Sequence, residues 1–182
     1  MQNSLESARW PDHVHWHRPA LRWRQRPPAR LLSWLGESGS LTARLQALSQ
    51  GDLRVQVLRE GWQRPTPEER RTLGLAAHTR AWVREVLLLG NDVAWVQARS
   101  VLPRSSLTGI GRRLTRLGNR SLGGLLFRDP ALRRGEIAIA RLRLGAEDVW
   151  ARRSALQLHG HPVLVAEAFL PALWAADPEL NG

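Results

Sequence analysis

Two charged residues, Arg84 and Glu167, lie inside otherwise apolar runs, and they are the positions where the sequence could most readily support chemistry. Glu167 belongs to the segment PVLVAEAFLP at 162–171. Alternate side chains of a strand share a face, so Glu167 is predicted to lie beside Val165 and Phe169. A carboxylate with such neighbours has to be paired, protonated or part of a binding site.

Arg84 has a similar setting, because a strand would place it on one face with Trp82 and Val86. A structural interpretation pairs it with Glu167 or Glu85, or lets the side chain extend past a sheet edge. A functional interpretation makes it the receptor for an anionic ligand. The pattern alone leaves both interpretations open.

A metal site is not expected. His13, His15 and His17 would share one face of a strand, and neutral imidazole suits zinc or copper. No carboxylate or thiolate stands at suitable spacing, and the chain has no cysteine.

Two other motifs are also missing. The glycine-rich GIGRRLTRLG lacks the lysine of a phosphate-binding loop, and no serine lies in a nucleophile elbow.

The formal charge of +11 invites a nucleic-acid interpretation, but we do not favour it. All 27 basic residues are arginine, which indicates a base-composition bias as much as a selected surface. The sequence has no nucleic-acid-binding motif and no continuous basic helix. A positive field would instead help to attract a small anionic substrate.

The length of 182 residues and 43% hydrophobic content fit one globular domain. No apolar stretch has the length of a membrane span, and the N-terminus has no signal-peptide core. We therefore expect a cytoplasmic monomer without stable membrane insertion.

Turn and cap residues outline an α+β domain with an antiparallel sheet. Short helices are predicted at 27–36, ending at Gly36, and at 39–51, with Ser40 as N-cap. Gly90-Asn91-Asp92 predicts a hairpin turn, and residues 104–128 predict short helices with flexible corners. The predicted strands are 53–62, 79–90, 93–103, 135–145, 149–160 and 162–171. The predicted organisation is an extended lead-in at 1–27, a domain at 28–175 and a tail at 176–182.

Six segments, in this order and approximate spacing, resemble the bacterial chorismate–pyruvate lyases. They are VLREGW, WVREVLLLG, ARSVLP, SLGGLLF, WARRSALQL and PVLVAEAFLP, and they span roughly residues 28 to 171. No single segment is diagnostic. Together they include both unusual charges, Arg84 and Glu167, which makes the resemblance specific.

The resemblance implies a single domain whose helical flaps enclose a small-molecule pocket. It also implies conversion of chorismate to 4-hydroxybenzoate and pyruvate for ubiquinone synthesis, without metal or organic cofactor. The ligand-contacting positions of the family fall on Leu41, Arg84, Leu122 and Glu167, of which Arg84 and Glu167 would be catalytic. The backbone amides of Leu41, at a helix start, and Leu122, before two glycines, would join Arg84 in binding the ring carboxylate.

Glu167 would then lie near the ring hydroxyl and the departing enolpyruvyl ether. An apolar surround would favour its protonated form and a general acid, but a base or an orienting group is equally allowed. A rival function is a non-enzymatic sensor, because the effector domains of one group of transcription regulators share this fold. Such regulators carry a winged-helix domain, for which the residues before Pro27 are too few.

Overall fold

A seven-stranded antiparallel sheet forms the centre of the computed structural model, which describes residues 9–17 and 26–178 apart from the side chains at 109–111. The strand order is β1-β2-β3-β7-β6-β4, and β5 pairs with β6. The strands are β1 Leu53–Gln63, β2 Ala81–Gly90, β3 Val93–Pro103, β4 Arg133–Arg134, β5 Ala138–Leu144, β6 Glu147–Leu158 and β7 His161–Phe169. This architecture confirms the predicted α+β class.

Tight turns set the register of the central strands. Asn91 and Asp92 have φ angles of 51° and 60°, which is the conformation of a two-residue hairpin turn, so the predicted β2–β3 hairpin is confirmed. His159 and Gly160, with φ angles of 50° and 79°, form the equivalent turn between β6 and β7.

The helices are short and lie around the sheet. They are the 3₁₀ helices η1 Ala29–Leu31, η2 Arg104–Leu107 and η3 Gly109–Arg116, and the α-helices α2 Leu32–Leu35, α3 Leu41–Leu48, α4 Pro67–Leu73, α5 Leu122–Leu126 and α6 Pro171–Ala176. Ser40 caps α3 as predicted, since its side chain accepts a hydrogen bond from the Ala43 amide at 3.3 Å. Within the described ranges, no helix is long and apolar enough to cross a membrane.

Two helices, α4 and α6, were not predicted. The signal for α4 is present in the sequence: Thr66 and Glu69 form a capping box, Pro67 occupies the first turn, and Gly74 ends the helix with φ of 65°. The helix has only seven residues and a mainly polar composition, so it gives no hydrophobic period to detect.

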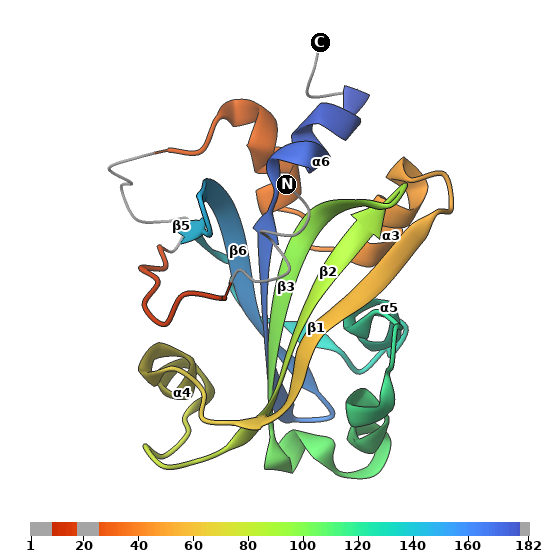
Figure 1. The fold of residues 1–182 in the computed structure, drawn as a ribbon. Helices are drawn as coiled ribbons and strands as arrows, with labels where there is room; N and C mark the ends of the chain where they lie inside the picture. The colour runs from red at the N-terminus through yellow and green to blue at the C-terminus, as the bar shows by residue number, and fades with distance from the viewer. Residues whose placement is uncertain (1–8, 18–25, 179–182) are drawn as a thin grey trace.

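The sheet separates two apolar layers (Figure 1). Helices α3 and α5 lie on one side of it and α4 lies on the other. Alternate residues of β7 supply both layers: Phe169 packs with α2 and α3, whereas Ala168 packs with Leu87 of β2. We call the side with α3 and α5 the cavity face and the side with α4 the ion-pair face.

Residues beyond 28–175 contribute to the core. Trp10 is 7% exposed and packs on the ion-pair face. Asp177 is buried and accepts a hydrogen bond from Trp34 Nε1 at 2.6 Å. The domain limits drawn from the sequence stay predictions, and residues 1–8, 18–25 and 179–182 lie outside the described part of the chain.

Candidate active site

A cavity of about 30 Å³ lies on the cavity face, between the sheet and the segment that contains α5. Three of the predicted site residues, Arg84, Leu122 and Glu167, line it. Leu41 is not in its wall but packs in the hydrophobic core, and its neighbour Thr42 lines the cavity instead. The structure thus brings together three of the four predicted residues.

Strand pairing explains why Arg84 and Glu167 reach the same space. Arg84 of β2 pairs with Ser100 of β3, and two residues earlier in β3, Ala98 pairs with Glu167 of β7. Ala98 and Ser100 point to the same face of the sheet, so Glu167 and Arg84, which pair with them, point to that face as well. One strand separates the two residues, which places their backbones roughly 10 Å apart.

Arg84 is held by contacts that the sequence did not specify. Its side chain is 2% exposed and forms an ion pair with Glu60 of β1. Its Nη2 donates to the carbonyl oxygens of Gly118 and Arg120, at 2.6 and 3.2 Å. The predicted structural alternatives, a pair with Glu167 or with Glu85, are therefore wrong. A guanidinium has five N–H groups, so Arg84 retains donors for a ligand after these contacts.

Glu167 is paired with Arg152, whose Nε donates to Glu167 Oε2 at 2.5 Å. Arg152 is itself 1% exposed, and its Nη1 donates to the carbonyl oxygens of Trp34 and Glu37 at 2.9 and 2.6 Å. A guanidinium partner stabilises a charged carboxylate. The apolar surround predicted for Glu167 is thus incomplete, because a guanidinium lies against its carboxyl group.

The starts of α3 and α5 meet above the cavity. Thr42 Oγ1 and Ser121 Oγ lie 2.6 Å apart and share a hydrogen bond. A Cβ atom on Gly123 would lie 2.9 Å from Thr42 Oγ1, so a larger residue would require the Thr42 side chain to shift. Leu41 and Leu122 are the first residues of their helices, where amide groups have no intrahelical acceptor.

Two further arginines, Arg134 in the cavity wall and Arg152 behind Glu167, received no role from the sequence. Arg152 is next to Arg153 in β6, and successive side chains of a strand point to opposite faces, so the sequence alone could not tell which of the pair faces the cavity. Arg134 belongs to β4, a strand of two residues that offers no alternating pattern to detect. Only the register of β4 against β6 brings Arg134 to the cavity wall.

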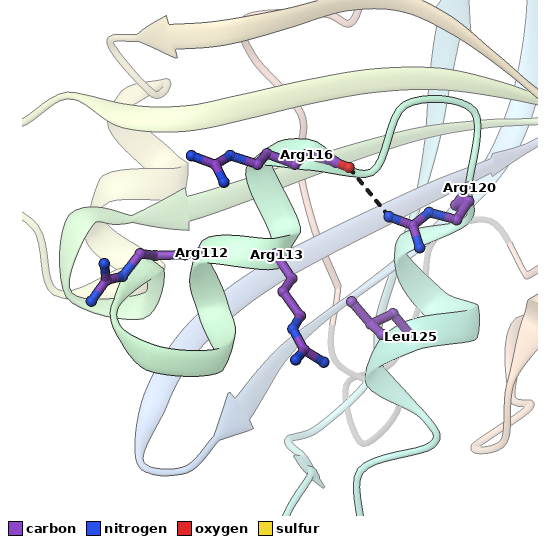
Figure 2. A pocket seen from close by; sticks show the side chains of 5 residues that line it. All are labelled: Arg112, Arg113, Arg116, Arg120 and Leu125. Atoms are coloured by element: carbon purple, nitrogen blue, oxygen red, sulfur yellow. Dashed lines mark hydrogen bonds between the residues drawn. The ribbon is translucent and has the colours of Figure 1, made fainter.

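A second, larger hollow of about 400 Å³ lies outside the cavity and is lined by Arg112, Arg113, Arg116, Arg120 and Leu125. Figure 2 shows Arg113 and Arg120 on the side of Leu125, whereas Arg112 and Arg116 extend away from it. These four arginines are exposed. Arg120 also lines the inner cavity, so the two spaces adjoin. We call this larger space the outer hollow.

The histidines singled out in the sequence do not form a metal centre in the described ranges. His17 pairs through its backbone with Ile139, in two hydrogen bonds of 2.8 Å. Among the residues that the structure describes, no group of three or more His, Cys, Asp or Glu side chains could hold a metal ion.

The chain is similar in sequence to curated proteins. A probable chorismate pyruvate-lyase of Pseudomonas aeruginosa is 48% identical over 151 residues, which cover 79% of this chain and 85% of that protein. A probable chorismate pyruvate-lyase of Thiobacillus denitrificans is 43% identical over 160 residues, covering 80% of this chain and 85% of that protein.

Among solved structures, the effector domain of PhnF from Mycobacterium smegmatis has a TM-score of 0.54 at 15% identity, covering 74% of this chain and 90% of that one, and it shares the fold. The sequence profile described as chorismate lyase matches residues 10–178. The chain therefore belongs to the chorismate lyase family.

Proposed function

We propose that this protein is a chorismate pyruvate-lyase that converts chorismate to 4-hydroxybenzoate and pyruvate. The observation that carries the proposal is the meeting of Arg84 and Glu167 in one enclosed cavity. Their side chains supply a fixed cation and a carboxylate at different positions along an apolar wall that includes Val86 and Leu156. Such a wall suits a carbocyclic ring, and the two charged groups suit its polar substituents.

In this proposal Arg84 binds the ring carboxylate, because its planar guanidinium can donate two parallel hydrogen bonds. The contacts from Arg84 to Glu60 and to the Gly118 and Arg120 carbonyls fix its orientation before a ligand arrives. The amides of Leu122 and Leu41 would add donors at the same end of the ring. Orientation of this kind lowers the entropic part of the barrier.

Glu167 then acts at the other end of the ring as a carboxylate. The reaction breaks the bond between ring carbon C3 and the ether oxygen, and the hydrogen on C4 leaves as a proton, so the ring becomes aromatic. The departing enolpyruvate gains a proton and becomes pyruvate. Because Arg152 Nε donates a hydrogen bond to Glu167 Oε2, we assign Glu167 to accept a proton or to orient the C4 hydroxyl.

The cavity of about 30 Å³ has room for one or two water molecules but not for an aromatic ring. Binding and release therefore require movement of the wall, and the segment around Leu122 lies on it. Gly118 has a φ of 54° and can act as a hinge for this segment. We expect product release to limit turnover, which a fast first turnover and strong product inhibition would reveal.

The direct test adds chorismate to the purified protein and follows 4-hydroxybenzoate by ultraviolet absorbance and mass detection. We expect stoichiometric product and pyruvate, with a rate unchanged by prolonged chelation. Binding of 4-hydroxybenzoate without turnover would favour the sensor instead. A rate that is lost on chelation and restored by zinc would contradict the metal-free mechanism.

The assignment to ubiquinone synthesis can be tested separately. A strain of the source organism that lacks this protein should lose ubiquinone and regain it when 4-hydroxybenzoate is supplied. Failure of 4-hydroxybenzoate to restore ubiquinone would remove the pathway assignment while leaving the lyase activity in place.

A further inference from the structure

Arg134 lies at the opposite side of the cavity from Arg84. It comes from β4, which pairs with β6 at the opposite edge of the sheet. Three strands, β3, β7 and β6, separate β4 from β2. Four strand spacings correspond to roughly 19 Å between the two backbones. Both side chains nevertheless line the same cavity, so they approach a bound ligand from two ends.

The contacts of Arg134 hold it in place without neutralising it. Its Nη1 donates to Ser154 Oγ at 2.6 Å, and its guanidinium lies 4.9 Å from the centre of the Phe127 ring. Its Nε is buried and has no hydrogen-bond partner. Within the described ranges, the ion pairs of the cavity join Arg84 to Glu60 and Arg152 to Glu167, and none includes Arg134.

The electrostatic environment of Arg134 also favours binding of an anion. Burial lowers the pKa of Arg134, the nearby Arg152 lowers it further, and the charges of Glu167 and Glu37 oppose this change. Arginine stays protonated in proteins, so the charge of the half-buried Arg134 persists. A buried donor without a partner costs free energy that a bound acceptor would recover.

The substrate of the proposed function carries a second anion. Besides the ring carboxylate, chorismate has a carboxylate on its enolpyruvyl group, which is attached next to the hydroxyl-bearing carbon. With Glu167 near that hydroxyl, the second carboxylate falls at the same end of the ring, where the charges of Glu167 and Arg134 interact.

The other cations in or next to the cavity wall fit this role less well. Arg152 has Glu167 as its carboxylate partner. Arg120 is exposed, and its Nε and Nη2 donate to the carbonyl oxygens of Leu117 and Arg116. Arg134 alone combines a buried unpaired donor with the absence of a carboxylate partner in the described ranges.

We propose that Arg134 binds the carboxylate of the enolpyruvyl group and thereby selects chorismate over ring acids that lack this group. The inference rests on the proposed lyase function and adds a specificity-determining residue to it. The two arginines then have separate roles. Arg84 binds the ring carboxylate, which substrate and product share, and Arg134 binds the carboxylate that leaves with pyruvate.

The test compares Arg134→Gln with the parent in two assays. We expect kcat/KM for chorismate to fall roughly 10- to 150-fold, the range for a lost charge-assisted contact. The Kd for 4-hydroxybenzoate, which has no second carboxylate, should change by less than threefold. The matched control is Arg133→Gln, whose exposed side chain donates to the Pro130 and Leu132 carbonyls and should leave both values unchanged.

An analogue of chorismate with the enolpyruvyl carboxylate converted to an amide sharpens the test. The parent should discriminate strongly against the amide, and Arg134→Gln should have lost most of this discrimination. Arg134→Lys, which keeps the charge, serves if the glutamine variant does not fold, and it should retain part of the discrimination.

Three results would overturn the inference. The first is an equal loss of chorismate turnover and 4-hydroxybenzoate binding in Arg134→Gln, and the second is no loss in either assay. The third is undiminished discrimination against the amide in a folded variant. A parent protein that produces no 4-hydroxybenzoate would instead overturn the proposed function, and this inference with it.

Discussion

The two faces of the sheet carry similar residues but use them differently. Arg84 and Glu85 are neighbours in β2, and Arg152 and Arg153 are neighbours in β6, so each strand sends one charged side chain to each face. On the ion-pair face, Arg99 and Arg153 each have a carboxylate against them. On the cavity face, Arg134 has none among the described residues.

The ion-pair face carries two sets of ion pairs that involve α4. Arg99 of β3 donates to Glu69 at 2.7 and 3.0 Å and to Glu85 at 2.5 Å. Arg153 pairs with Glu68 of the same helix. Burial alone would lower the pKa of Arg99, but hydrogen bonds and charges from Glu69 and Glu85 raise it above its ordinary value.

This difference between the two faces shows that a buried arginine is not by itself a sign of function. What distinguishes the cavity face is its buried donors without a hydrogen bond, Arg134 Nε at the cavity wall and Nη2 of Arg152, the partner of Glu167. On the ion-pair face the corresponding buried atom is an acceptor, Glu85 Oε2, and it still has Arg59 Nε at 3.6 Å. A network whose charges are mutually satisfied stabilises the fold, whereas one with unpaired donors is prepared for an anion. Substitutions on the two faces should therefore have different effects.

The largest effect is expected for Glu167→Gln on the cavity face. This variant keeps the shape and hydrogen-bonding ability of the side chain but cannot take up a proton. If Glu167 performs acid–base chemistry, kcat should fall by about 10²–10⁴-fold while 4-hydroxybenzoate still binds.

If Glu167 mainly neutralises Arg152, the variant should instead lose stability, by about 3–5 kcal/mol for a broken buried pair. Steady-state kinetics and thermal unfolding of one preparation separate the two outcomes. Full lyase activity in a well-folded Glu167→Gln protein would contradict the catalytic assignment.

On the ion-pair face, Arg99→Leu should reduce stability rather than catalysis. Removing the cation leaves Glu69 and Glu85 buried without it, so the free energy of unfolding should fall by about 3–5 kcal/mol. Urea unfolding measures this change, and kcat per folded molecule should stay near that of the parent.

The control for Arg99→Leu is Arg54→Gln, which removes exposed pairs with Asp52 and Asp92 and should cost less than about 1 kcal/mol. A large loss of kcat in folded Arg99→Leu would show that the two faces are coupled.

Arg84→Lys should have an intermediate effect. Lysine keeps the charge but cannot provide a planar pair of donors, so the free energy of 4-hydroxybenzoate binding should weaken by about 1.5–3 kcal/mol. Calorimetric titration measures it, and Arg84→Lys should weaken chorismate and 4-hydroxybenzoate together, unlike Arg134→Gln. Unchanged affinity for 4-hydroxybenzoate would show that Arg84 is structural.

The smallest effect is expected in the outer hollow. Replacing Arg112, Arg113 and Arg116 by glutamine removes exposed charges beside the cavity, which should lower kcat/KM for chorismate a few-fold at low ionic strength. At high salt the triple variant and the parent should converge, because exposed charges are screened. A defect that persists at high salt would indicate direct contact with the ligand.

The sequence by itself determined the local features of this protein. Alternation in PVLVAEAFLP predicted which residues share a face with Glu167, and Asn91-Asp92 predicted the turn that sets the β2–β3 register. Ser40 predicted the start of α3. These features depend on neighbours a few residues away, so they can be read directly from the chain.

Tertiary structure alone decided the partners of the charged residues. Arg84 contacts Gly118, 34 residues away in the chain, and Arg152 contacts Trp34, which is 118 residues away. Such pairings depend on strand order and on how α2 and the segment before α5 close over the sheet. No periodicity encodes them, because the energy of an ion pair depends on distance and burial in space rather than on separation along the chain.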